Sequence, residues 1–221
     1  PVGIVTFFPG KEIFTGVRRI IKVESIKVQL LYVGVQVIVP GGFGGRGIEG
    51  MINTAKYCRT HKVPYFGICL GMQIVCIEYA RNVLGFEDAN STEMDEKTTH
   101  PVIALMPDQN GKILGGTLRL GKFECTVTPG TKTEAAYGST TVWERHRHRY
   151  EFNNEFREDY KNAGLIIAGI NPERDLVEIV EVPDHPWMVG VQFHPEFKSR
   201  PNKAGPLFRE FVKAACEAKK N

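Results

Sequence analysis

The chain has 221 residues, of which 42% are hydrophobic and 24% charged, and 28 basic against 25 acidic side chains give a net charge of +3. This composition is typical of a globular protein and excludes a disordered, fibrous or coiled-coil chain. The small positive charge does not indicate nucleic-acid binding, which needs a clustered basic surface.

The first hundred residues alternate apolar strands with helices. Run length and helical spacing predict strands over 2–7, 26–33, 35–39 and 65–68, and helices over 14–22, 48–61 and 70–84. This alternation predicts an α/β fold with a mostly parallel, doubly wound (flavodoxin-like) sheet covered on both faces. Only Gly34 separates two of these strands, whereas a parallel crossover needs a dozen or more residues. We therefore expect residues to be missing from the numbering near Val33-Gly34.

From about Pro101 the pattern changes to short strands separated by turn residues. The sequence predicts strands over 102–105, 116–120, 165–168, 176–180 and 188–192, and helices over 155–163 and 206–219. No repeat, low-complexity segment or linker interrupts the chain. We therefore predict a single domain, in which an antiparallel strand region is added to the parallel sheet.

The strongest local motif is G-I-C-L-G at 67–71, between a predicted strand and a predicted helix. This G-x-C-x-G pattern is a nucleophile elbow with cysteine as the nucleophile. The positive end of the helix dipole favours the thiolate of Cys69, and the amide of Leu70 can stabilise an oxyanion. The alternative is a structural cysteine near a turn.

The remaining cysteines lack such a context. No C-x-x-C spacing occurs, so neither a disulfide framework nor a zinc site is indicated, and we expect reduced thiols in a cytoplasmic protein. No apolar run reaches the roughly 20 residues of a membrane helix, and the N-terminus lacks the pattern of a signal peptide. We expect no membrane partner. The four thiols interpreted as structural are Cys58, Cys76, Cys125 and Cys216.

A cysteine nucleophile that acts on an amide needs a proton shuttle, and His194 is the best candidate. It follows an apolar strand and precedes Pro195-Glu196. Glu196 is close enough in sequence to bond the second ring nitrogen and select the tautomer. The alternative is a structural histidine. His146 and His148 could share a strand face as metal ligands, but no third ligand is nearby, so we predict no metal site.

Arginines surround these two histidines in the string E-R-H-R-H-R-Y-E at 144–151. A solvated basic strand and an anion-binding arginine are both consistent with it. A second glycine-rich segment, P-G-G-F-G-G-R-G at 40–47, lies between a strand and a helix. It lacks the ending of a P-loop. A phosphate cradle and an oxyanion donor at Gly42 are both consistent with this loop.

Three short motifs occur in a fixed order: P-G-G at 40–42, G-I-C-L-G at 67–71 and H-P-E at 194–196. Together they resemble the triad glutamine amidotransferases. Longer strings resemble the glutaminase domains of CTP synthases over about 35–212, whereas the first 35 residues match poorly. These strings are V-P-G-G-F-G at 39–44, N-S-T-E at 90–93, E-R-H-R-H-R-Y-E at 144–151 and Q-F-H-P-E-F at 192–197.

The resemblance implies a role for each motif residue. Cys69 would be the nucleophile, His194 the general base and acid, and Glu196 the group that orients His194. The oxyanion donors would be Gly42 and Leu70. The residues that would hold glutamine are Gly42, Phe43, Leu70, Gly71, Met72, Gln73, Glu93 and Arg149. Their charges fit this assignment, because Arg149 can clamp an α-carboxylate and Glu93 can pair with an α-ammonium.

The resemblance also implies that residues 1–221 form a glutaminase domain, without the amidoligase (synthase) domain of the family. No ATP-binding motif is found in the sequence. In the family the ammonia converts UTP to CTP, in pyrimidine nucleotide biosynthesis, with ATP and Mg²⁺ in the synthase domain and GTP as an activator. We expect a homo-oligomeric full-length ligase. The alternatives are the glutaminase domain of another amidotransferase, a γ-glutamyl peptidase, a non-catalytic glutamine-sensing module and a nucleotide-binding domain.

Overall fold

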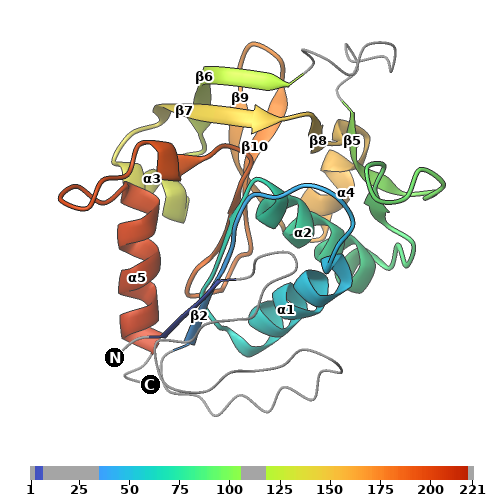
Figure 1. The fold of residues 1–221 in the computed structure, drawn as a ribbon, viewed down its shortest axis with the longest axis horizontal. Helices are drawn as coiled ribbons and strands as arrows, with labels where there is room; N and C mark the ends of the chain where they lie inside the picture. Colours follow the sequence, from blue (N-terminus) through green and yellow to red (C-terminus); the bar gives the residue numbers. More distant parts are fainter. Residues whose placement is uncertain (1–2, 7–34, 106–117, 219–221) are drawn as a thin grey trace.

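The computed structural model describes residues 3–6, 35–105 and 118–218, and Figure 1 shows how its elements are arranged. The strands are β1 (Gly3–Thr6), β2 (Val35–Val39), β3 (Tyr65–Ile68), β4 (Asn90–Ser91), β5 (Pro101–Leu105), β6 (Arg119–Val127), β7 (Thr141–His148), β8 (Tyr150–Phe152), β9 (Ile166–Asn171), β10 (Leu176–Glu181) and β11 (Met188–Val191). The α-helices are α1 (Ile48–His61), α2 (Leu70–Tyr79), α3 (Lys132–Tyr137), α4 (Arg157–Asn162) and α5 (Pro206–Ala218).

The main sheet joins a parallel part to an antiparallel part. Its strand order is β1-β2-β3-β11-β10-β9-β6-β7. The pairings from β1 to β11 are parallel, and those from β11 to β7 are antiparallel. A smaller sheet has the order β4-β5-β8. The predicted single α/β domain with an additional antiparallel region is therefore confirmed. The antiparallel part extends further than expected. A short turn joins β9 to β10, and β6 pairs with β7 after a connection that contains the short helix α3.

Helices cover both faces of the main sheet, and α5 lies on the side opposite α1 and α2 in Figure 1. Successive strand residues point to opposite faces. Accordingly Tyr65 belongs to the hydrophobic cluster under α1 and α2, and Phe66 belongs to the cluster under α5. The ring centroid of Phe66 lies 5.3 Å from that of Phe208 and 5.8 Å from that of Phe211. These contacts hold α5 against the sheet.

Several predicted elements match the structure closely. The predicted strands 35–39 and 65–68 and the predicted helix 48–61 have the same bounds in the structure. The predicted helix 70–84 is α2 followed by a short π-helix at Ala80–Leu84. Every residue of α2 is buried, as expected for a helix that is apolar on all sides.

Other elements differ from the prediction. Strand β6 runs on to Val127, and α3, β7 and β8 complete a region that the sequence pattern predicts incompletely. The predicted helix 155–163 begins with a 3₁₀ turn at Asn154–Phe156 and continues as α4. The predicted elements at 14–22 and 26–33, and the gap suspected near Val33-Gly34, lie outside the described residues.

Three neighbouring parallel strands, β2, β3 and β11, end at the same edge of the sheet. Ligands and reactive groups in open α/β sheets gather at the carboxyl ends of the strands. Here Gly41 follows β2, Cys69 follows β3 and His194 follows β11. Motifs that are far apart in the sequence are therefore brought to one place by the sheet.

Candidate active site

The turn at Cys69 is sharp and strained, as the elbow motif predicts. Cys69 has φ 52° and ψ −102°, a region that non-glycine residues rarely occupy. Its amide donates to the carbonyl of Val191 at 2.7 Å, and its own carbonyl accepts from the amide of Met72 at 3.1 Å. The turn is therefore held by β11 on one side and by the first turn of α2 on the other.

The two glycines of the elbow are needed because backbone atoms approach them closely. A Cβ added to Gly67 would collide with the carbonyl group of Gly71, and a Cβ added to Gly71 would collide with the carbonyl oxygen of Val39. The close approach of the backbone around Cys69 therefore requires glycine at both positions. Any larger residue at either position would force α2 away from β2 or β3.

His194 is oriented by Glu196, as the H-P-E motif predicts. Nδ1 of His194 lies 2.6 Å from Oε1 of Glu196, so the proton on Nδ1 faces the carboxylate and Nε2 is the second nitrogen. Nε2 is buried and has no hydrogen-bond partner within the described part of the chain. The ring stacks on Phe197 with centroids 5.1 Å apart, and the amide of His194 donates to the carbonyl of Arg145 at 2.7 Å.

The glycine-rich loop brings the cysteine and the histidine to one point. A Cβ built on Gly41 would lie 2.7 Å from Cε1 of His194 and 3.5 Å from Cβ of Cys69. Both side chains therefore border the space above Gly41. The cysteine and the histidine are therefore neighbours beside the glycine-rich loop, as a nucleophile and its proton shuttle would have to be.

The resting thiol of Cys69 is protonated. Burial raises the pKa of Cys69 to about 12, the amide of Leu70 opposes this, and the carboxylates of Glu151, Glu196 and Glu93 raise it further. The dipole of α2 was expected to favour the thiolate, but desolvation outweighs it here. A nucleophilic role for Cys69 would therefore require that its proton be removed as the sulfur attacks.

Of the predicted glutamine-binding residues, Glu93 lies beside the glycine-rich loop. The amide of Gly44 donates to Oε1 of Glu93 at 3.3 Å, which places this carboxylate against the glycine-rich loop, where it would repel a phosphate. Burial raises the pKa of Tyr150, Glu93 adds to the increase and Arg149 opposes it. The charges of Glu93 and Arg149 thus both affect the phenol of Tyr150.

Phe43, on the glycine-rich loop, is 58% exposed. The roles of these residues stay predictions.

A chain of two buried amides leads to the nucleophile, and sequence reasoning missed it. Nε2 of Gln73 donates to the carbonyl of Tyr150 at 3.2 Å and to Oε1 of Gln192 at 3.3 Å. Nε2 of Gln192 in turn lies 3.7 Å from Sγ of Cys69. The available signal was a polar Gln192 inside an otherwise apolar stretch after β11.

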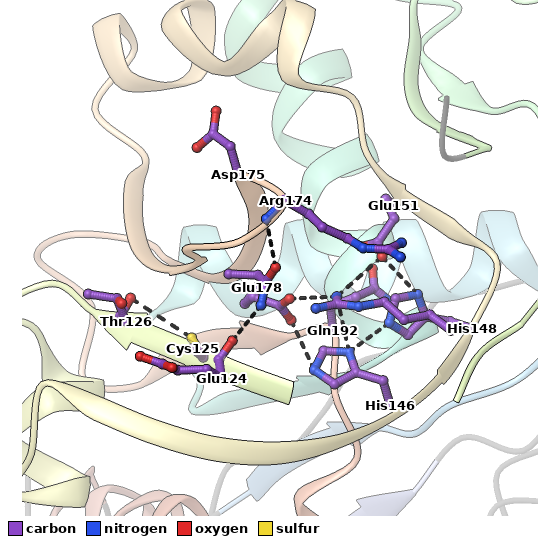
Figure 2. A network of polar contacts seen from close by, with 12 residues as sticks. Glu124, Cys125, Thr126, His146, His148, Glu151, Arg174, Asp175, Glu178 and Gln192 are labelled. Carbon is purple, nitrogen blue, oxygen red and sulfur yellow. Dashed lines mark hydrogen bonds and ion pairs between the residues drawn. The ribbon is translucent and has the colours of Figure 1, made fainter. Parts of the chain in front are cut away.

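The two histidines of β7 are buried, so a solvated basic strand, one of the two alternatives left open by the sequence, is wrong for this face. Residues of β7 alternate between exposed and buried, so Arg145 and Arg147 face solvent whereas His146 and His148 point inward. Figure 2 shows the histidines together with Glu151 and Glu178 in a buried polar network. Side chains of a strand alternate between its two faces, but which face of β7 is buried depends on its partners from other strands.

Arg119 contributes a buried positive charge to this network. Its Nη1 lies 2.6 Å from Oε1 of Glu178 and 3.4 Å from Oε1 of Glu151. Nδ1 of His146 lies 2.8 Å from Nε2 of His148. Burial raises the pKa of Glu178 to about 7. Burial also lowers the pKa of His148 to about 3 and lowers the pKa of His146 further, so both histidines are neutral at pH 7. Within the described ranges no group of three or more candidate ligands could hold a metal ion.

Comparison with known proteins identifies the class to which this fold and site belong. Residues 18–214 match the family model described as glutamine amidotransferase class-I. The chain therefore belongs to the class-I glutamine amidotransferase family.

Within this family the chain corresponds to the glutaminase domain of CTP synthase. It is 60% identical over 185 residues to CTP synthase of Treponema denticola, and 59% identical over 184 residues to CTP synthase of Clostridium acetobutylicum. These matches cover 84% and 83% of this chain but 34% of each relative, so the chain spans about a third of their length.

The solved structures agree with this position in the family. The glutaminase domain of Trypanosoma brucei CTPS, solved with bound acivicin, matches with a TM-score of 0.78 and 40% identity, over 82% of this chain and 71% of that chain. A protein of Thermoplasma acidophilum assigned as a GMP synthase subunit shares the fold alone, with a TM-score of 0.51 and 16% identity over 84% of this chain and 74% of that chain.

No helix in the described ranges is long and apolar enough to cross a membrane.

Proposed function

We propose that this chain hydrolyses L-glutamine to glutamate and ammonia through a γ-glutamyl thioester on Cys69. The observation that carries the proposal is the convergence of Cys69 and the His194–Glu196 pair on the space above Gly41. A cysteine beside a histidine that is bonded to a carboxylate supplies a nucleophile, a base and the group that orients the base.

The first half-reaction begins with a neutral thiol. Nε2 of His194 accepts the proton of Cys69 while the sulfur attacks the carboxamide carbon of glutamine, which gives a tetrahedral oxyanion. Amides of Gly42 and Leu70 are our candidates for the donors to that oxyanion. The carbon–nitrogen bond then breaks, the imidazolium gives its proton to the departing nitrogen, and ammonia and the thioester remain.

The second half-reaction releases glutamate. His194 removes a proton from water, which attacks the thioester carbonyl, and the thiolate leaves and regains a proton. Glu196 keeps the ring in the required tautomer and stabilises the imidazolium in both halves. The carboxylate side chain is 41% exposed, so water screens part of this stabilisation.

We assign glutamine recognition to residues around the elbow. Glu93 would pair with the α-ammonium group and Arg149 with the α-carboxylate, since a desolvated zwitterion needs both partners. The other proposed contacts come from the glycine-rich loop and the start of α2. They are Gly42, Phe43, Leu70, Gly71, Met72 and Gln73.

We further propose that the ammonia is used by a synthase domain, which would convert UTP to CTP with ATP and Mg²⁺ and respond to GTP. Support comes from the relatives named CTP synthase, which are about three times as long as the matched region. A homo-oligomeric full-length enzyme is part of the same proposal.

Replacing Cys69 tests the proposed hydrolysis. We expect Cys69→Ala to abolish glutamate formation because no nucleophile remains, while circular dichroism and the thermal midpoint stay close to those of the parent. Cys216→Ala is the matched control, since Cys216 is exposed on α5 and remote in sequence from the motifs. It should retain full turnover.

A labelling experiment supplies a second measurement if turnover of the isolated chain is low. A glutamine-like electrophile such as acivicin should add to Cys69, and free glutamine should protect against the addition. Undiminished glutamate formation by Cys69→Ala, or labelling that glutamine does not slow, would contradict the proposal.

A further inference from the structure

The orientation of two buried amides is fixed by one backbone carbonyl. A carbonyl oxygen can only accept hydrogen bonds. The side-chain nitrogen of Gln73 lies 3.2 Å from the carbonyl of Tyr150, so the amide must present its NH₂ group and not its oxygen to that strand. This settles which way the Gln73 amide points.

The orientation of the second amide follows from that of the first. The same NH₂ group of Gln73 has a second hydrogen, which it donates to Oε1 of Gln192 at 3.3 Å. With its oxygen engaged there, Gln192 directs its own NH₂ group at Sγ of Cys69, 3.7 Å away. The sulfur therefore faces an N–H donor and not an amide oxygen.

The surroundings make this donor important for the nucleophile. Both glutamines are buried, Gln192 completely, so little water can replace either amide. The carboxylates of Glu151, Glu196 and Glu93 all disfavour a thiolate at Cys69. The backbone amide of Gln192 donates to the carbonyl of Glu178 at 2.8 Å, which fixes the main chain from which the side chain projects. A hydrogen bond to a buried anion is among the stronger ones in proteins.

We propose that Gln192 is a further catalytic residue, whose side-chain amide donates to the sulfur of Cys69 and stabilises the thiolate as it forms. Gln73 and the carbonyl of Tyr150 act as positioning groups that hold this amide in the donating orientation. A catalytic role for Gln192 rests on the proposed function. The effect of Gln192 on the pKa of Cys69, in contrast, can be measured without glutamine.

The test compares Gln192→Met and Gln192→Glu with the parent, all in a Cys216→Ser background that removes the exposed thiol. Methionine keeps the length and loses the donor, whereas glutamate keeps an acceptor for Gln73 and places an oxygen against the sulfur. The rate of Cys69 alkylation by iodoacetamide is followed between pH 6 and 10 by peptide mass spectrometry. Gln36→Met is the matched control, since Gln36 is also a buried glutamine but lies on β2.

Loss of the donor should reduce the thiolate fraction at fixed pH by about tenfold. A less stabilised thiolate is also a better nucleophile, so the alkylation rate should fall by less, roughly threefold to tenfold. The alkylation rate should fall further in Gln192→Glu than in Gln192→Met, because the glutamate oxygen repels the thiolate. Gln36→Met should alkylate like the parent.

The outcomes separate this inference from the proposed function. Parental alkylation rates in either folded Gln192 variant would overturn the inference, even if glutamine turnover were lost, since that would show a structural role only. If the parent does not hydrolyse glutamine but the variants alkylate more slowly, the proposed function fails and the hydrogen bond to Cys69 stands. Thermal midpoints identify the folded variants, and either variant alone decides the question.

Discussion

Cys69 combines a strained backbone with a thiol that burial keeps protonated. Its amide and carbonyl are both hydrogen-bonded, so β11 and α2 hold the residue in a conformation that an isolated turn would avoid. Because the thiol starts neutral, the position of the His194 ring decides whether its proton can leave. The narrow space above Gly41 thus controls the reactivity of Cys69.

Gly41→Ala tests this control of ring position. The added Cβ would lie 2.7 Å from Cε1 of His194, so the ring must shift. We expect glutamate formation to fall roughly 100-fold, the scale of a small misplacement in an active site. Gly45→Ala is the matched control, because a Cβ there meets nothing within 4 Å. Equal activity of the two variants would rule out this account.

The elements that surround the site differ in how far the sequence predicts them. Bounds of β2, β3 and α1 follow from local runs and spacing, and the triad candidates follow from motifs at strand ends. The inward face of β7 cannot be predicted from local sequence, because the burial of His146 depends on Arg119 and Glu178, which lie far away in the chain. The Gln192 donor likewise depends on contacts between β8, α2 and the end of β11.

The network that joins β6, β7, β8 and β10 should titrate near neutrality. Burial raises the pKa of Glu178 to about 7, well above its ordinary value, while Arg119 opposes the increase. Between about pH 4.5 and 7 the folded state keeps a proton that the unfolded state has released, so this contribution to stability is lost as the pH rises. Glu178→Gln removes that dependence.

From pH 7 to pH 5 the parent should therefore gain stability relative to Glu178→Gln, by roughly 1–2 kcal/mol in the free energy of unfolding. Urea denaturation at both pH values measures the difference. His148, whose low pKa destabilises the fold in acid, is present in both proteins and largely cancels. Glu158→Gln, at an exposed pair on α4, should show no such change. A pH-independent difference for Glu178→Gln would refute the assignment.

At the scale of the whole molecule, stability depends on two hydrophobic cores separated by one sheet. The core under α5 contains Phe66, Leu207 and Phe211, and none of these three side chains is exposed. Helix α5 also contacts α3, where Nη2 of Arg209 donates to the carbonyl of Ala136 at 3.3 Å. Loss of one of these three side chains should weaken the docking of the helix.

Phe211→Ala should lower the free energy of unfolding by about 3–5 kcal/mol, since the change leaves a cavity against Phe66. Val212→Ala, at the next position but 41% exposed, should stay within about 0.5 kcal/mol of the parent. Urea denaturation measures both. Similar losses for the two variants would mean that α5 is not held by this core.

The position of β11 has a consequence for how the protein is made. This strand lies between β3 and β10, although it is synthesised after every other described strand. Until it emerges from the ribosome, the parallel and antiparallel parts of the sheet have no strand between them. The amide of Cys69 also lacks its acceptor, Val191, and no His194 is present. Until synthesis has passed the H-P-E motif, the growing chain therefore lacks both the backbone acceptor for Cys69 and the histidine that the proposed mechanism pairs with it.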